Sequence, residues 1–198
     1  MIKVASFVEL FRRLPKGVLF ATAGLVQVAV LAMMVIDRAE ILRDGREVVL
    51  HVAPVDPRDL LRGDYVVLSY VISNVPAGEL EGKPVSNDGV VYVKLRPDPD
   101  GGFYRASSVH INAVPVTPPE VLLRGRSVHS DYCGGFYCST LRIKYNLESY
   151  FVPEGEGLKL ERIGTGRLTV VAAVLPSGRA AIKRLLVDGK PVYDEPWF

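Results

Sequence analysis

The chain has 198 residues, with 24 Lys and Arg against 22 Asp and Glu and a formal net charge of +2, which is the size of one domain plus an accessory segment. Residues 1–36 sum to +3, so residues 37–198 sum to −1. A folded part with this balance excludes an extended basic surface for nucleic acid, and no nucleic-acid partner is expected.

A continuous apolar stretch runs from residue 17 to residue 36 without a charged side chain. Twenty residues of α-helix rise about 30 Å, which matches the hydrocarbon core of a bilayer. We therefore predict a transmembrane anchor helix at 17–36, a basic cytoplasmic N-terminus at 1–16 and a juxtamembrane extension of the helix at 37–45. A cleaved signal peptide, which has a shorter apolar region and a small-x-small cleavage site, is disfavoured, because the apolar run is long and ends in Met33, Met34, Val35 and Ile36.

The charges that flank this stretch predict its orientation. Arg12, Arg13 and Lys16 precede it, and no positive excess follows it. The positive-inside rule then places the N-terminus in the cytoplasm and the rest of the chain outside. The predicted location is the inner (cytoplasmic) membrane, crossed once, with the lipid bilayer as a partner.

After this anchor, residues 46–198 have the pattern of one β-rich extracytoplasmic domain. Short runs of β-branched and aromatic residues alternate with turn sequences rich in Gly, Pro, Asn and Asp. The pattern predicts a mainly β fold, an antiparallel β-sandwich or barrel-like domain with one or two short helices. Strands are expected at 46–55, 65–72, 90–95, 103–110, 121–131, 136–146, 167–175 and 179–187, loops at 74–89 and 147–166 (the latter with a short amphipathic helix), and a turn and tail at 188–198.

The segment from Pro54 to Tyr70 precedes and enters one of these strands. Asp56 is predicted to cap a short helical turn whose first residue is Pro57, since Asp accepts an orphan N–H and Pro has none to lose. Gly63 is expected to end the turn. The charges of this segment exceed what a turn needs, which makes it a candidate binding region.

Two cysteines, Cys133 and Cys138, enclose Gly-Gly-Phe-Tyr. In an oxidising compartment they can form a local disulfide across the tip of a hairpin. The competing interpretation, a metal or redox pair, lacks further ligands nearby and the CxxC spacing. We therefore expect no metal site and no cofactor.

Two features of the sequence bear on a hydrolase. Residues 63–66, Gly-Asp-Tyr-Val, resemble the segment that follows the nucleophile in type I signal peptidases, but 54–57 read Pro-Val-Asp-Pro where those enzymes carry Ser-Met-x-Pro. Carboxylates are the second feature, since Asp64, Glu154 and Glu156 have the chemistry of a general acid-base site. Backbone capping explains the first of them as well, and no catalytic residue is assigned.

With these residues in view, the chain resembles the GDYxxLxY family of membrane-anchored bacterial proteins. The motif stands here as Gly63-Asp64-Tyr65-Val66-Val67-Leu68-Ser69-Tyr70, and 54–58 and 150–157 are similar to family segments. The resemblance implies an N-terminal anchor and a domain outside the cytoplasm, and it implies no activity.

The leading hypothesis is an interaction or assembly module that binds another membrane or envelope protein. A binding site is expected between 56–70 and 150–157, formed by Arg58, Asp64, Tyr65, Glu154 and Glu156. The alternative is an envelope hydrolase, signal-peptidase-like or carboxylate-based, acting at the membrane surface.

Overall fold

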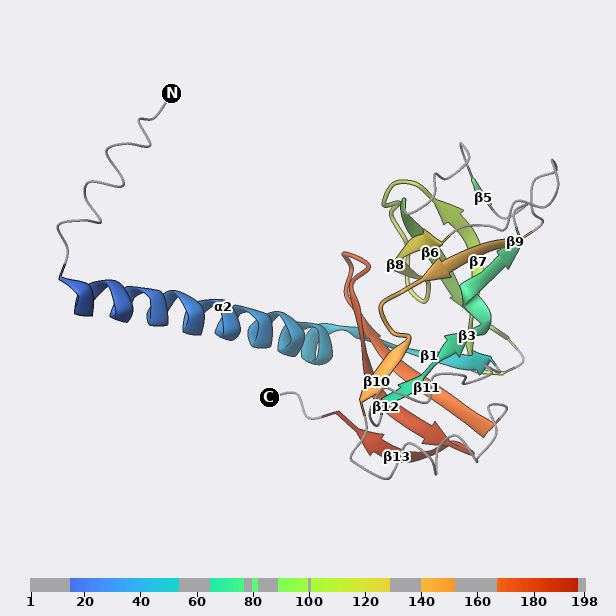
Figure 1. The fold of residues 1–198 in the computed structure, drawn as a ribbon. Helices are drawn as coiled ribbons and strands as arrows, with labels where there is room; N and C mark the ends of the chain where they lie inside the picture. The colour runs from blue at the N-terminus through green and yellow to red at the C-terminus, as the bar shows by residue number, and fades with distance from the viewer. Residues whose placement is uncertain are drawn as a thin grey trace. The chain divides into compact units, whose positions relative to one another are not determined.

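The computed structural model describes residues 15–53, 65–76, 80–81, 89–99, 101–128, 140–151 and 167–195 (Figure 1). The chain divides between Ala39 and Glu40 into two units. The second unit contains every strand of the described ranges.

The first unit contains most of helix α2, which spans Lys16–Asp44 and has 29 residues. Large apolar side chains such as Phe20, Leu25 and Met33 are exposed along it. The hydroxyl of Thr22 donates to the Val18 carbonyl at 2.8 Å, so this polar group is satisfied within the helix. By length and composition, α2 is able to cross a membrane.

The last turn of α2 belongs to the second unit and packs on a sheet. Ile41 and Leu42 are buried against Ala173, Leu175 and Ala181. The adjoining strand, β11 (Leu168–Val174), is therefore covered on both faces, which explains its nearly unbroken apolar sequence VVAAV.

The first large sheet is antiparallel and has the strand order β13-β12-β11-β1-β3 (Figure 1). Its strands are β1 (Arg46–Ala53), β3 (Ser69–Tyr70), β11 (Leu168–Val174), β12 (Ala180–Val187) and β13 (Lys190–Asp194). The predicted hairpin at 167–187 is confirmed as β11 and β12.

The second large sheet has the order β4-β9-β8-β6-β7-β5. All its pairs are antiparallel except β5 with β7. Its strands are β4 (Asn74–Pro76), β5 (Leu80–Glu81), β6 (Val90–Pro97), β7 (Tyr104–His110), β8 (Val121–Val128) and β9 (Thr140–Lys144). A separate two-stranded ladder joins β2 (Tyr65–Val67) to β10 (Ser149–Phe151).

One hydrophobic core takes side chains from both large sheets. Alternate residues of β1 and β6 are fully buried, among them Val48, Leu50, Val91 and Val93, and they share the core with Leu123 of β8. This alternation is the period expected when one face of a strand is buried. The predicted mainly β fold is confirmed.

Some element predictions were wrong. The strand expected at 65–72 is broken into β2, β3 and a 3₁₀ turn, η1 (Val71–Ser73). The predicted loops 74–89 and 147–166 contain β4, β5 and β10, and the predicted tail contains β13. Strands β4, β5 and β10 have two or three residues and pair with distant segments, so local sequence does not reveal them. Strand β13 instead forms a hairpin with the adjacent β12.

Candidate functional site

The segment after Tyr65 crosses from one sheet to the next. Tyr65–Val67 pairs with β10, Ser69–Tyr70 pairs with β1, and Asn74–Pro76 pairs with β9. Only Leu68 and the η1 turn separate these three pairings. The segment therefore connects all three sheets within twelve residues.

Hydrogen bonds at Leu68, Tyr70 and Ile72 fix the middle of this segment against residues 145–148. The Tyr70 hydroxyl donates to the Leu147 carbonyl at 2.7 Å, and the Leu68 N–H donates to the Glu148 carbonyl at 2.7 Å. In the opposite direction, the Tyr145 hydroxyl donates to the Ile72 carbonyl at 2.6 Å. Because each acceptor is a backbone carbonyl, these bonds fix the backbone of residues 68–72 against that of residues 145–148.

The two phenols are structural donors. Burial raises the pKa of Tyr70 well above its ordinary value, and the nearby carboxylate of Glu148 raises it further. The pKa of Tyr145 is raised by the same two causes in the same order. Both hydroxyls are therefore protonated at neutral pH and hold their carbonyl partners.

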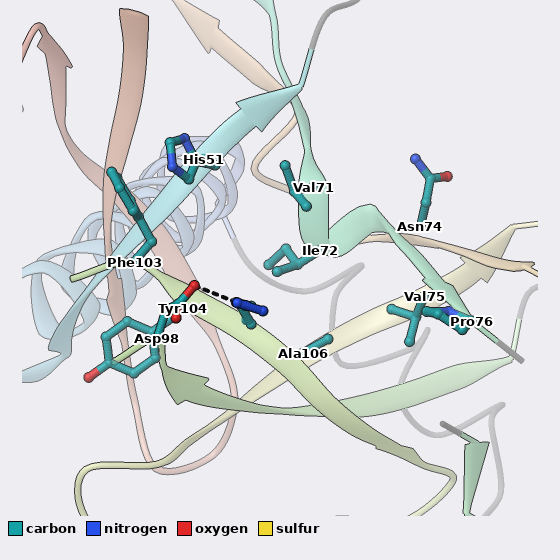
Figure 2. Close-up of a pocket in the computed structure, with 11 residues that line it drawn as sticks. His51, Val71, Ile72, Asn74, Val75, Pro76, Asp98, Phe103, Tyr104 and Ala106 are labelled. Atoms are coloured by element: carbon teal, nitrogen blue, oxygen red, sulfur yellow. Dashed lines mark hydrogen bonds and ion pairs between the residues drawn. The ribbon is translucent and has the colours of Figure 1, made fainter. Parts of the chain in front are cut away.

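The second half of this segment, residues 71–76, lines a pocket of about 270 Å³. Figure 2 shows His51 and Phe103 together at one end, Asn74, Val75 and Pro76 at the other, and Val71 and Ile72 between them. The lining is mainly apolar. Ile72 and Val75 are anchored in the core, whereas the Val71 side chain is 60% exposed.

Two charged groups of the pocket are engaged with each other, and its histidine is stacked on a phenylalanine ring. Arg105 donates to the Asp98 carboxylate in an ion pair (Figure 2). The rings of His51 and Phe103 are stacked at a tilt of 34°, with 3.6 Å between their centroids. In this ion pair the Asp98 carboxylate accepts from the Arg105 guanidinium. This arrangement favours binding of an apolar group over acid-base chemistry.

The predicted site residues fall largely outside the described residues. Arg58, Asp64, Glu154 and Glu156 lie there, and so do both cysteines of the predicted disulfide, Cys133 and Cys138. Tyr65 is the first residue of β2, and its backbone pairs with that of Phe151. The chain thus enters β2 and leaves β10 at one end of the same ladder, so the segments 54–64 and 152–166 attach to neighbouring points.

The pocket residues were missed by the sequence analysis. His51 lies within the strand expected at 46–55, and Phe103 is the first residue of the strand expected at 103–110. One signal was present, because strand alternation puts Val71 on the face opposite to Tyr70 and Ile72. A single exposed apolar residue is common on protein surfaces, so this signal becomes informative only once the structure places Val71 in a mainly apolar pocket.

Comparison with known proteins gives one match. The model of a family described as "GDYXXLXY protein" matches residues 27–185. No curated protein and no solved structure matches the chain.

Proposed function

This chain belongs to the GDYXXLXY family, and we propose that it is a membrane-anchored interaction module of the cell envelope. In this proposal the pocket beside Val71 holds an apolar segment of another envelope protein. The observation that carries the proposal is the exposure of Val71, 60%, in a mainly apolar pocket next to the buried Tyr70.

The anchor in this proposal is α2. Its apolar residues 17–36 would cross the inner membrane once, with residues 1–16 in the cytoplasm and 46–198 outside, as the flanking charges favour. After reduction, Cys133 and Cys138 are then expected to react with a membrane-impermeant thiol reagent in intact spheroplasts. Labelling that requires lysis would contradict this orientation.

The dimensions of the pocket favour a peptide side chain as its occupant. Small-molecule sites usually measure about 300–1,000 Å³, and this one is about 270 Å³. An extended segment would place one or two apolar side chains against Val71 and Phe103. Beside the pocket lies β4, an edge strand of its sheet, where Pro76 provides no N–H for a further ladder. Binding of a partner's apolar side chains in the pocket therefore fits better than pairing of a partner strand with β4.

A charge at Val71 tests this proposal. The change Val71→Asp removes apolar surface and places a carboxylate in the pocket, so a partner that co-purifies with the full-length chain from native membranes is expected to be lost. Because Val71 is exposed, the thermal unfolding midpoint is expected to change little.

The matched control is Val192→Asp. Val192 is 52% exposed, lies on β13 and does not line the pocket. The same partner should remain with this variant. Equal recovery of the partner with both variants would contradict the proposal.

The hydrolase remains a second candidate on one observation, the pairing of Tyr65 with Phe151. This pairing attaches the segment that carries Asp64 and the segment that carries Glu154 and Glu156 at one end of a ladder. A hydrolase predicts turnover of peptides or glycans by the full chain that is lost in Asp64→Asn or Glu154→Gln. Absence of turnover in the unmodified chain would rule against it.

A further inference from the structure

A second cavity, of about 330 Å³, lies between β8 and β9 of the six-stranded sheet and the turn before β12, and it is lined by four cations. They are Arg124, Arg126, Lys144 and Arg179. Polar surface predominates over apolar surface in this cavity, the reverse of the pocket beside Val71.

Strand register brings three of these cations together. Arg126 of β8 is directly opposite Lys144 of β9, a spacing of about 5 Å between Cβ atoms. Arg124 is two residues before Arg126 and so shares its face. All three side chains are exposed. Like charges directly opposite each other destabilise a sheet.

The turn between β11 and β12 supplies the fourth cation. The Arg124 N–H donates to the Gly178 carbonyl at 2.8 Å, which holds this turn on β8. Arg179 follows Gly178 and forms an ion pair of 3.5 Å with Glu40. Within the described ranges, Arg124, Arg126 and Lys144 form no ion pair. The cavity therefore carries positive charge that the described side chains do not neutralise.

We propose that this cavity binds a phosphate group, as a phosphodiester or phosphomonoester. Guanidinium groups match phosphate oxygens through paired N–H donors, and Lys adds a point charge. A phosphate anion between β8, β9 and the β11–β12 turn would remove the repulsion between Arg126 and Lys144.

The end of the helix suggests the source of this phosphate. Ile41 also lines the cavity and follows the end of the apolar stretch, Ile36, by five residues. Five residues of any backbone reach at most about 18 Å. A lipid headgroup is therefore within reach if the anchor spans a bilayer. The bilayer as source rests on the proposed anchor, whereas phosphate binding itself does not.

The test uses the full-length chain in neutral detergent, titrated by calorimetry with two probes at constant ionic strength. One probe is short-chain phosphatidylglycerol in micelles, and the other is soluble glycerol phosphate. The variants are Arg124→Gln with Arg126→Gln, and Lys144→Gln alone. Each lost charged hydrogen bond is expected to weaken binding roughly tenfold. The control is Arg96→Gln, an exposed cation of the same sheet that does not line the cavity.

The two probes separate the two sources. Binding of the lipid alone, weakened by the cavity variants and unchanged in Arg96→Gln, supports a bilayer headgroup. Binding of both probes with the same dependence supports a soluble phosphate compound. Binding of neither probe, or equal weakening by Arg96→Gln, overturns the proposal. The calorimetric test does not involve Val71, so a negative result would not contradict the proposed interaction module.

Discussion

Tyr70 is the residue at which the motif, the core and the fold meet. Its ring is fully buried and its hydroxyl reaches a carbonyl that lies 77 residues away in sequence. Two requirements therefore explain a tyrosine at this motif position: the core holds a large apolar ring, and the Leu147 carbonyl accepts from a donor at the far end of that ring. Tyrosine is the side chain that meets both.

The change Tyr70→Phe isolates the second requirement. It leaves the buried Leu147 carbonyl without its 2.7 Å donor, which is expected to lower the free energy of unfolding by about 1–2 kcal/mol. Tyr104→Phe is the control, because its hydroxyl makes an exposed bond of 3.3 Å to Pro119. Chemical denaturation of the full chain measures both, and equal losses would contradict the assigned role.

Alkaline pH provides a second prediction at this scale. Burial raises the pKa of Tyr70 and Tyr145 in the folded state, whereas both titrate near pH 10 once unfolded. Below about pH 10 the stabilisation is complete. Above it, the unfolded state releases protons that the folded state keeps, so the free energy of unfolding falls as pH rises.

The double variant Tyr70→Phe, Tyr145→Phe tests this cause. Its unfolding free energy should fall less steeply between pH 9 and 11, a window set by the unfolded phenol pKa of about 10. Lysine deprotonation is common to both proteins and cancels in the comparison. Identical slopes would show that the two phenols do not carry the effect.

At the residue scale, sequence alternation predicts which side chains of residues 68–72 are buried. Leu68, Tyr70 and Ile72 share one face and are all in the core. Their hydrogen-bond partners were out of reach of the sequence, because Leu147 and Glu148 fall in a segment with no strand pattern of its own. Tertiary contact alone brings the two segments together.

At the element scale, most of the longer strands, which are rich in β-branched and apolar residues and bounded by turn residues, were predictable. The hairpins β6–β7 and β11–β12 lie where the turn residues placed them. The pieces β3, β4 and β10 have two or three residues, which is too short for a period to be recognised. They are strands because an edge of β1, β9 or β2 lies beside them.

The turn after β11 is an element with a testable contact. Gly178 has a φ of +84°, and a Cβ there would lie 3.0 Å from the Arg124 nitrogen. Gly189 has a φ of +77°, and a Cβ added there would have nothing within 4 Å. Each change to Ala incurs the left-handed strain of about 1–2 kcal/mol.

Gly178→Ala is expected to be more destabilising than Gly189→Ala, because only the first also disturbs packing on β8. Thermal unfolding of the two variants measures the difference. Equal destabilisation would show that the β11–β12 turn does not depend on its contact with Arg124.

At the scale of the whole molecule, overall charge concealed a local feature. Residues 37–198 sum to −1, which gives no indication that Arg124, Arg126, Lys144 and Arg179 surround one cavity. The pairing register of β8 with β9, and the β11–β12 turn of the other large sheet, bring these four side chains together. The pocket beside Val71 is likewise assembled from β1, η1, β4 and the β6–β7 region, so composition does not predict it.

The family match and the sequence pattern cover largely the same residues of this molecule. The family match covers 27–185, and the pattern predicted both an apolar helix and a mainly β fold. Neither identifies a partner. In the proposed function, the partner is an apolar segment that binds in the pocket beside Val71, and this proposal rests on the exposure of Val71 and the mainly apolar lining.

The most direct measurement is site-specific photocrosslinking in native membranes, with the photoreactive residue at position 71 of the full-length chain. The account predicts an adduct with one other envelope protein, whose crosslinked peptide, identified by mass spectrometry, is an apolar segment. The same residue at position 192 should not give this adduct. No protein adduct at position 71, or the same adducts at both positions, would contradict the account.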